Sequence, residues 1–165
     1  MKRLFFVLMT AALLLPACSA FRRTPEEEAR IAALVDQRLE ARQYRIYVDY
    51  MIPRRGPSKS ITDPYCITVD GEKLNSYLPY FGVAYSLPYG GGKALNFEDT
   101  IDEYIDYGWQ KGRRSIAFST NNDEDIIVYT LTIYDGGSAD INVHCRNRDD
   151  IKFRGSLDPD SYPKD

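Results

Sequence analysis

The sequence of 165 residues contains a single histidine, His144, and only three cysteines, Cys18, Cys66 and Cys145. One histidine excludes a site built from several histidine ligands, and so few cysteines exclude a cysteine-rich zinc module or a dense disulfide scaffold. An excess of positive charge is also missing, because 21 Lys and Arg residues stand against 24 Asp and Glu residues, a formal net charge of −3. Such a chain lacks the broad basic field of a nonspecific nucleic-acid binder. We therefore expect no metal, no cofactor and no nucleic-acid partner.

Long apolar runs are missing too, apart from one stretch at the N-terminus. Lys2 and Arg3 precede an apolar stretch over residues 4–15. This stretch is shorter than the roughly 20 apolar residues that span a bilayer, and the pattern is typical of a secretory signal. The sequence therefore predicts a signal peptide over residues 1–17 and no transmembrane helix.

Residues 15–18, with the sequence Leu-Pro-Ala-Cys, resemble the lipobox of bacterial lipoproteins. In a lipobox the cysteine thiol accepts a diacylglyceryl group, and a peptidase cleaves after the small residue that precedes it. We expect lipidation of Cys18, a tether over residues 18–23, and attachment to a membrane through the acyl chains. The tether has no acidic run, which favours the outer membrane with the protein facing the periplasm. An ordinary cleaved signal, with Cys18 as a bystander, is the alternative.

The pattern after the tether is that of one amphipathic helix. Thr24 is a suitable N-cap, Pro25 suits the first helical position, and Glu27 completes a capping box. Apolar residues then recur at helical spacing, and they predict a helix of about 18 residues. Its apolar stripe is narrow and lacks Trp and Phe, so we expect it to pack on the domain rather than lie on a membrane.

From Tyr44 onward the apolar period changes from helical to two, which is typical of half-buried strands. Tight turns such as 70–71 and 135–137 make successive strands antiparallel neighbours. We expect one β-rich domain over residues 24–157, folded as a lipocalin-like barrel, half-barrel or sandwich, and a flexible tail over residues 158–165. The helix can either plug an end of the barrel or cover an open face. The expected strands, about eight in number, cover residues 44–50, 65–69, 74–78, 101–109, 116–120, 127–133, 139–145 and 151–153.

The irregular segment over residues 79–99 is the densest feature of the sequence. A long aromatic loop is costly to keep unless it packs or binds, and tyrosine offers both a flat apolar face and a hydroxyl. We therefore take the aromatic residues in and near it as candidates for contact with a ligand or a partner. These candidates are Tyr77, Tyr80, Phe81, Tyr85, Tyr89 and Trp109. The alternative is a structural lid with its tyrosines hydrogen-bonded inside.

Several of these features together resemble one protein family. They are the lipobox, the helix, the aromatic and glycine-rich stretch over residues 77–92, the sequence Leu-Asn-Phe at 95–97, and the closing residues 151–157. This combination resembles the domain-of-unknown-function family 4251, small lipoproteins of gut-type anaerobic bacteria. The resemblance implies a mainly β domain and an envelope location, and it brings no established activity. Cys66 and Cys145 are not part of the pattern.

Recognisable catalytic or ligand motifs are weak. The run at 90–93 lacks the spacing of a phosphate loop, and residues 121–125 lack the glycine of a calcium loop, so a hairpin turn explains them better. His144 is expected on the solvent face of its strand. Asp102 and Asp106 would lie about 7 Å apart along a strand, a spacing that a carboxylate pair could use. We interpret them, with Tyr104, as an exposed polar face, opposite Ile101, Glu103, Ile105, Tyr107 and Trp109.

Cys66 and Cys145 leave two alternatives open. An oxidising periplasm would allow a disulfide between them. Alternation, however, directs Cys66 away from the apolar face of its strand, whereas Cys145 shares the apolar face of its own. Two small buried side chains without a bridge are therefore the simpler interpretation.

The sequence thus predicts a non-enzymatic, lipid-anchored protein of the cell envelope. Binding of a small amphipathic ligand in a barrel mouth, beneath the aromatic segment, is the first hypothesis. Docking on another envelope component through the same segment is the alternative. An enzyme with a carboxylate site remains a third and weaker hypothesis.

Overall fold

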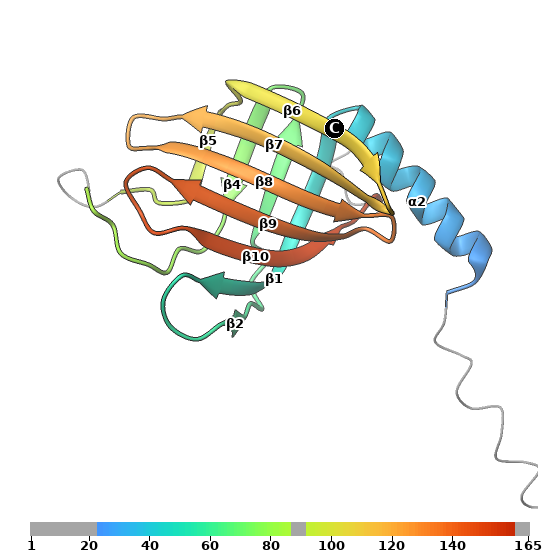
Figure 1. Cartoon of the computed structure of the whole chain (residues 1–165), viewed down its shortest axis with the longest axis horizontal. Helices are drawn as coiled ribbons and strands as arrows, with labels where there is room; N and C mark the ends of the chain where they lie inside the picture. Colours follow the sequence, from blue (N-terminus) through green and yellow to red (C-terminus); the bar gives the residue numbers. More distant parts are fainter. Residues whose placement is uncertain (1–22, 87–91, 161–165) are drawn as a thin grey trace, which may run out of the picture.

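The computed structural model describes residues 23–86 and 92–160. The expected signal peptide, Cys18 and Tyr89 lie outside these residues. The described part contains one helix followed by strands (Figure 1). The elements are α2 (Pro25–Glu40), β1 (Gln43–Pro53), β2 (Lys59–Ser60), β3 (Cys66–Asp70), β4 (Lys73–Tyr77), β5 (Asn96–Thr100), β6 (Glu103–Gln110), β7 (Arg113–Asn121), β8 (Ile126–Tyr134), β9 (Ser138–Cys145) and β10 (Ile151–Leu157).

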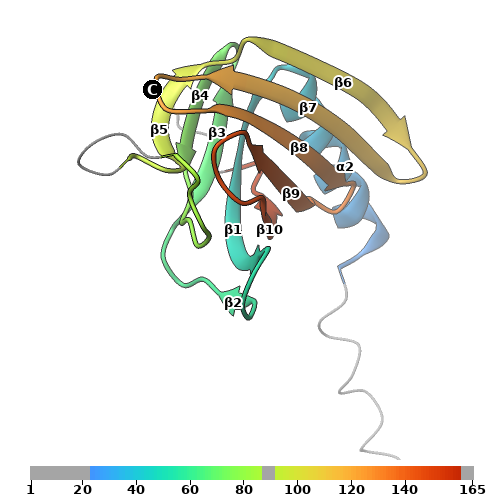
Figure 2. The same ribbon diagram turned by 60° about the vertical axis from the view of Figure 1, so that its left-hand side comes forward.

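The strands form one curled antiparallel sheet in the order β5-β4-β3-β1-β10-β9-β8-β7-β6, with β2 paired to β1 beside this path. Figures 1 and 2 show the sheet wrapped into a half-barrel. Among the described residues no ladder joins the two edge strands β5 and β6. The prediction of a mainly β protein with one N-terminal helix is confirmed, and of the architectures considered the structure has the half-barrel.

All the expected strands are present, and two further strands were not predicted. The strand β5 lies inside the segment that the sequence presents as irregular. Its side chains are mostly exposed and Phe97 is its one buried residue, so it shows no apolar alternation. It forms because β4 offers a free edge for pairing. The sequence pattern likewise does not predict β2, which has only two residues.

The helix α2 begins as the sequence predicts. The hydroxyl of Thr24 accepts a hydrogen bond from the Glu27 amide at 3.2 Å, and the Glu27 carboxylate accepts one from the Thr24 amide at 2.9 Å. Its C-terminal half buries Val35 and Leu39 against the sheet. Figure 2 shows α2 beside the concave side of the sheet, where it covers the core. The helix therefore packs on the domain, as expected.

The concave side of the sheet is filled by the core. Parallel rings of Tyr104, Phe118 and Tyr129 follow one another with centroids 6.1 and 4.9 Å apart. The buried Tyr129 hydroxyl donates to the hydroxyl of Ser76 at 3.0 Å, and that hydroxyl donates to the carbonyl of Leu95 at 2.8 Å. These two buried hydroxyls are thus paired, as buried polar groups usually are.

One expectation about β6 is wrong. Tyr104 and Asp106 point to the concave side, because their partners in β7 are the buried Phe118 and Ile116. Ile105 and Tyr107 are instead 40% and 56% exposed. Alternation alone does not reveal which face of an edge strand is covered, and here α2 covers the face that carries the aspartate.

A bulge in β6 also changes the side on which Trp109 lies. Asp106 pairs with Ile116 and Trp109 pairs with Arg114, so one extra residue of β6 is inserted between these pairs. Gly108 has a φ of +70°, a conformation that glycine adopts at little cost. Trp109 therefore shares the concave face with Asp106.

In the described residues no helix is long and apolar enough to cross a bilayer.

Candidate functional site

The structure places the aromatic candidates among its described residues at four different positions. Phe81 and Tyr85 are exposed near the end of the β1–β2 region, whereas Tyr77 lies on the convex face of the sheet. Trp109 contacts α2. Tyr80 belongs to segment 79–86, is half-buried, and directs its hydroxyl to the Asp149 carbonyl. The candidates thus do not form one continuous site.

Segment 79–86 is held against the connection between β9 and β10. Ala84 forms a β-bridge with Arg148, the Tyr85 amide donates to the Asn147 carbonyl at 2.8 Å, and the Asp149 amide donates to the Val83 carbonyl at 2.9 Å. These backbone bonds give the segment the geometry of a short strand. The sequence gives no sign of this pairing, because its partners lie more than 60 residues apart.

Tyr80 has the structural role that was the alternative for the aromatic residues. Its hydroxyl lies 3.1 Å from the Val83 carbonyl and 3.2 Å from the Asp149 carbonyl, to which it donates. Burial, with smaller effects from Cys145 and Asp149, raises the pKa of Tyr80 to about 12. The hydroxyl therefore stays protonated at neutral pH and acts as a hydrogen-bond donor that holds segment 79–86 against the connection between β9 and β10.

Asp149 organises the surface above it. Its side chain is 1% exposed and accepts hydrogen bonds from the Tyr85 hydroxyl and from the Val83 amide, the latter at 3.2 Å. Nitrogen atoms of Arg54 and Arg55 lie 3.9 and 3.6 Å from its oxygen atoms. The hydrogen bond from Tyr85 is the largest cause of the lowered pKa of Asp149, which the Val83 amide and the two guanidinium groups lower further against the effect of burial.

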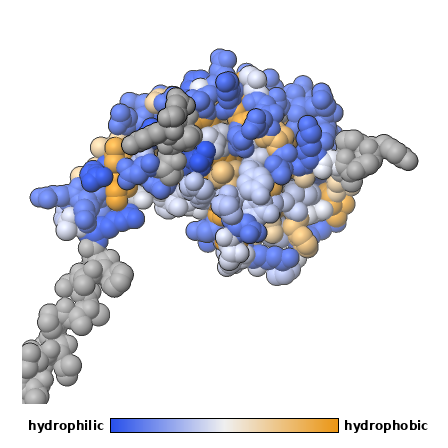
Figure 3. Space-filling view, turned by 180° about the vertical axis from the view of Figure 1, so that it is seen from behind, coloured by the Kyte–Doolittle hydropathy of each residue, from blue (hydrophilic) through white to orange (hydrophobic). Residues whose placement is uncertain are grey.

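We call the exposed group around this carboxylate the basic–aromatic surface. It presents apolar and aromatic side chains that are 44–59% exposed, together with three cations. The Lys59 ammonium lies 4.3 Å from the centroid of the Phe81 ring, within cation–π range. Figure 3 shows apolar side chains reaching the surface at the end of the molecule away from α2. The surface consists of Arg54, Arg55, Lys59, Phe81, Val83 and Tyr85.

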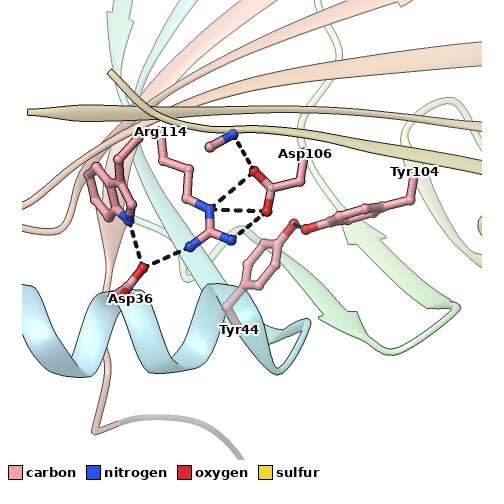
Figure 4. A network of polar contacts seen from close by, with 7 residues as sticks. Asp36, Tyr44, Tyr104, Asp106 and Arg114 are labelled. Atoms are coloured by element: carbon pink, nitrogen blue, oxygen red, sulfur yellow. Dashed lines mark hydrogen bonds and ion pairs between the residues drawn. The ribbon is translucent and has the colours of Figure 1, made fainter. Parts of the chain in front are cut away.

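Trp109 belongs to a different cluster, which fastens α2 to the sheet. Its indole N–H donates to Asp36 Oδ1 at 2.6 Å, and Arg114 Nη1 donates to the same oxygen at 2.7 Å. Arg114 also binds Asp106 through Nε and Nη2, at 3.0 and 2.5 Å from Oδ2 (Figure 4). Arg114 is 8% exposed, so two carboxylates neutralise a nearly buried cation.

The same cluster accounts for Asp106, one of the two carboxylates that the sequence raised as a catalytic pair, whereas Asp102 is exposed just before β6 and takes no part in it. Burial raises the pKa of Asp106, but the hydrogen bonds from Arg114 and from the Gly108 amide outweigh it, so the pKa is lowered. Asp106 is therefore ionised and fully engaged. Next to it the hydroxyls of Tyr44 and Tyr104 are 3.3 Å apart (Figure 4). The geometry is that of a structural clamp.

The remaining sequence candidates are individually accounted for. His144 is exposed as expected, and its Nδ1 lies 2.7 Å from Asp150 Oδ1. Asn122 caps the turn between β7 and β8 by accepting from the amides of Glu124 and Asp125, which fits the hairpin-turn interpretation. No group of three or more His, Cys, Asp or Glu side chains within residues 23–86 and 92–160 has the geometry of a metal site.

Cys66 and Cys145 are both free, so the disulfide that the sequence left open is not formed. Cys66 is half-buried on the convex side of the sheet, between Tyr47 and Tyr77, whereas Cys145 is buried in the core. The sheet itself therefore separates the two thiols, which follows from the alternation noted in the sequence.

The basic part of the surface is not apparent from the sequence. Arg54, Arg55 and Lys59 occupy a connection whose glycine and prolines indicate only a loop, and Asp149 appears only as part of a turn. The adjacent arginines were a possible signal. Their association with Phe81 and Tyr85, however, depends on the fold.

Comparisons with known proteins agree with the architecture. A family model described as a domain of unknown function (DUF4251) matches residues 26–157. No curated protein matches the chain. The crystal structure of a DUF4251 family protein from Bacteroides eggerthii is similar, with a TM-score of 0.59 and 18% sequence identity, covering 78% of this chain and 87% of that one. At this identity the likeness shows the fold alone.

Proposed function

Because the chain belongs to the DUF4251 family, whose description states no activity, we propose its role from its own geometry. The protein is a lipid-anchored, non-enzymatic component of the cell envelope that docks on another envelope component through the basic–aromatic surface. The partner presents an acidic patch with an apolar centre. The anchor is the acyl group on Cys18 in the outer membrane, with the domain in the periplasm.

The composition and exposure of the surface carry this proposal. Phe81, Val83 and Tyr85 are 46%, 44% and 59% exposed. Aromatic residues and arginine are the types that contribute most binding energy at protein interfaces. The surface combines three cations with one carboxylate in a chain whose net charge is −3, so its charge is opposite to that of the protein as a whole. An acidic partner is therefore attracted to this end of the molecule.

The position of the surface supports the same role. In Figures 1 and 2 segment 79–86 lies at the end of the sheet opposite to the N-terminus of α2. A six-residue tether reaches at most about 20 Å. An anchor at Cys18 would thus hold the helix end near the membrane and leave the basic–aromatic surface facing away from it.

Binding of an amphipathic ligand inside the barrel has less support. The concave side, where such a ligand would sit, holds the packed rings of Phe118 and Tyr129 and aliphatic side chains that are almost completely buried. Docking from the outside requires no displacement of this core.

Site-specific crosslinking in the producing cells tests the docking role. A photoreactive phenylalanine analogue at position 81 of the full chain should give one dominant protein adduct. Replacing Arg54 and Arg55 with glutamine should remove that adduct, whereas Arg154→Gln, an exposed arginine on β10, should leave it unchanged. The same analogue at Tyr107, which is exposed on β6, is the control for nonspecific reaction. A diffuse set of adducts, or the same adduct from position 107, would contradict the proposal.

The anchor has its own test. Wild-type protein should enter the detergent phase on phase separation, and Cys18→Ala should remain in the aqueous phase. Equal partitioning of both would show that Cys18 is a bystander.

A further inference from the structure

The convex face of β1, β3, β4 and β5 carries two adjacent rows of side chains that cross all four strands. In the first row Arg45 pairs with Thr68, Thr68 with Asn75, and Asn75 with Glu98. The second row lies two residues later on β1 and β4 and two residues earlier on β3 and β5, and its members are Tyr47, Cys66, Tyr77 and Asn96. One row is therefore polar and the other is rich in aromatic residues.

The polar row is held in place by its own hydrogen bonds. Arg45 Nε donates to Thr68 Oγ1 at 2.9 Å, and Asn75 Nδ2 donates to Glu98 Oε1 at 2.7 Å. These bonds use part of the capacity of each planar group, because a guanidinium has five N–H donors and a carboxylate accepts through two oxygens. The groups are thus oriented before any ligand arrives, which reduces the entropic cost of binding.

The aromatic row forms one wall of a hollow. The Tyr77 ring packs on Tyr65 with centroids 4.8 Å apart and remains 39% exposed. Tyr47 lies in the same row and its hydroxyl is 3.5 Å from Arg45 Nη1. Together with the polar row these rings line a shallow groove of about 480 Å³ on the outside of the sheet.

We infer that this groove is a binding platform for a short, neutral oligosaccharide. The charges of Arg45 and Glu98 balance, so the lining does not select a charged ligand. A sugar offers hydroxyl groups for guanidinium, amide and carboxylate partners on one row, and an apolar ring face for the tyrosines on the other. Three inter-strand spacings give the rows a length of about 14 Å, more than a single sugar ring occupies. Small ligands prefer sites that enclose them. A shallow groove encloses little of a ligand, so it suits a chain of several sugar units that lies along it better than a single sugar.

The platform is separate from the docking role, because it uses none of the six residues of the basic–aromatic surface. Tyr77 was an aromatic candidate in the sequence, and this is the place where it contributes. Cys66 lies in the middle of the aromatic row, so its rate of alkylation reports whether the groove is occupied. The buried Cys145 is the internal control for that rate.

Calorimetric titration of the full chain with a panel of neutral glucan, mannan and N-acetylglucosamine oligosaccharides of three to six units tests the inference. At least one should bind, and Tyr77→Ala and Asn75→Ala should each weaken it by tenfold or more. Tyr107→Ala and Phe81→Ala remove exposed rings elsewhere and should leave the affinity unchanged. The bound oligosaccharide should also slow alkylation of Cys66, measured by peptide mass spectrometry, without changing that of Cys145.

Two results would overturn the inference. One is the absence of binding across the panel at millimolar concentration. The other is binding that survives Tyr77→Ala or fails to protect Cys66, which would locate the sugar elsewhere. Loss on Phe81→Ala instead would assign it to the basic–aromatic surface. The crosslinking test of docking measures a protein adduct and not sugar binding, so failure of the platform and failure of the docking proposal can be told apart.

Discussion

The hydroxyl of Tyr85, a residue that is 59% exposed, donates a hydrogen bond to the carboxylate of Asp149, whose side chain is almost completely buried. This contact connects a surface ring to an anion beneath it. The same anion lies near Arg54 and Arg55, so the ring and both cations have a common reference point. The arrangement of the basic–aromatic surface therefore depends on the charge of one residue that a partner would not touch.

The first prediction concerns acid. The pKa of Asp149 is lowered in the folded protein. The ionised carboxylate therefore stabilises the fold fully when the pH is above the pKa of this carboxyl in the unfolded chain, about 3.9. That contribution is lost as the pH falls through the lower folded pKa. Segment 79–86 should therefore loosen below about pH 4. The Val83 amide resonance, followed by NMR during acidification, should shift in the wild type. In Asp149→Asn it should show no such step, and an identical step in the variant would assign it to another group.

The second prediction concerns the clamp between α2 and the sheet. Arg114→Met leaves Asp36 and Asp106 without their cation, and it should lower the free energy of unfolding by about 2–3 kcal/mol. Asp36→Ala removes a carboxylate that is 41% exposed, so its cost should be about 1 kcal/mol. It should also shift the fluorescence of Trp109, which loses its indole partner. Asp123→Ala, at an exposed position in the β7–β8 turn, is the control for urea denaturation. Equal costs for all three variants would contradict the clamp.

The third prediction concerns the close approach of β1 and β10. A Cβ atom at Gly155 would lie 1.8 Å from the carbonyl oxygen of Tyr47. Because this oxygen belongs to the backbone, β1 or β10 would have to shift to remove the overlap. Gly155→Ala should therefore lower the free energy of unfolding by more than about 3 kcal/mol or prevent folding. Gly136→Ala meets nothing within 4 Å and should change it by less than about 0.5 kcal/mol. Thermal unfolding of the two variants decides the matter, and a mild effect at Gly155 would show that the strands separate easily.

The fourth prediction concerns the thiols. Burial, and to a lesser extent Asp125, raises the pKa of Cys145 to about 12, so at neutral pH this residue is a protonated thiol. Thiolate is the reactive form. Native protein should be alkylated at Cys66 much faster than at Cys145, and denaturation without reductant should make both react. A missing pair of thiols in the denatured protein would show a bridge that this structure does not contain.

The features that sequence reasoning predicted are local. The capping box of Thr24 and Glu27 and the helical spacing behind it are contained within a few residues, and so is the alternation from Tyr44 onward. Tight turns fix the antiparallel order of their own strands. For this reason the helix, the main strands and the mainly β class could be predicted, and the family resemblance likewise rested on short local stretches such as the lipobox and residues 77–92.

Tertiary structure decided everything that depends on distant partners. The strand β5 forms because β4 provides an edge, and the covered face of β6 follows from the position of α2 and from the bulge at Gly108. The two candidate surfaces have the same origin. Asp149 joins Arg54 to Tyr85, and the rows on the convex face align residues from four strands. The sequence alone determines which residues alternate. The register between strands, which long-range packing and hydrogen bonding select, determines which of them meet.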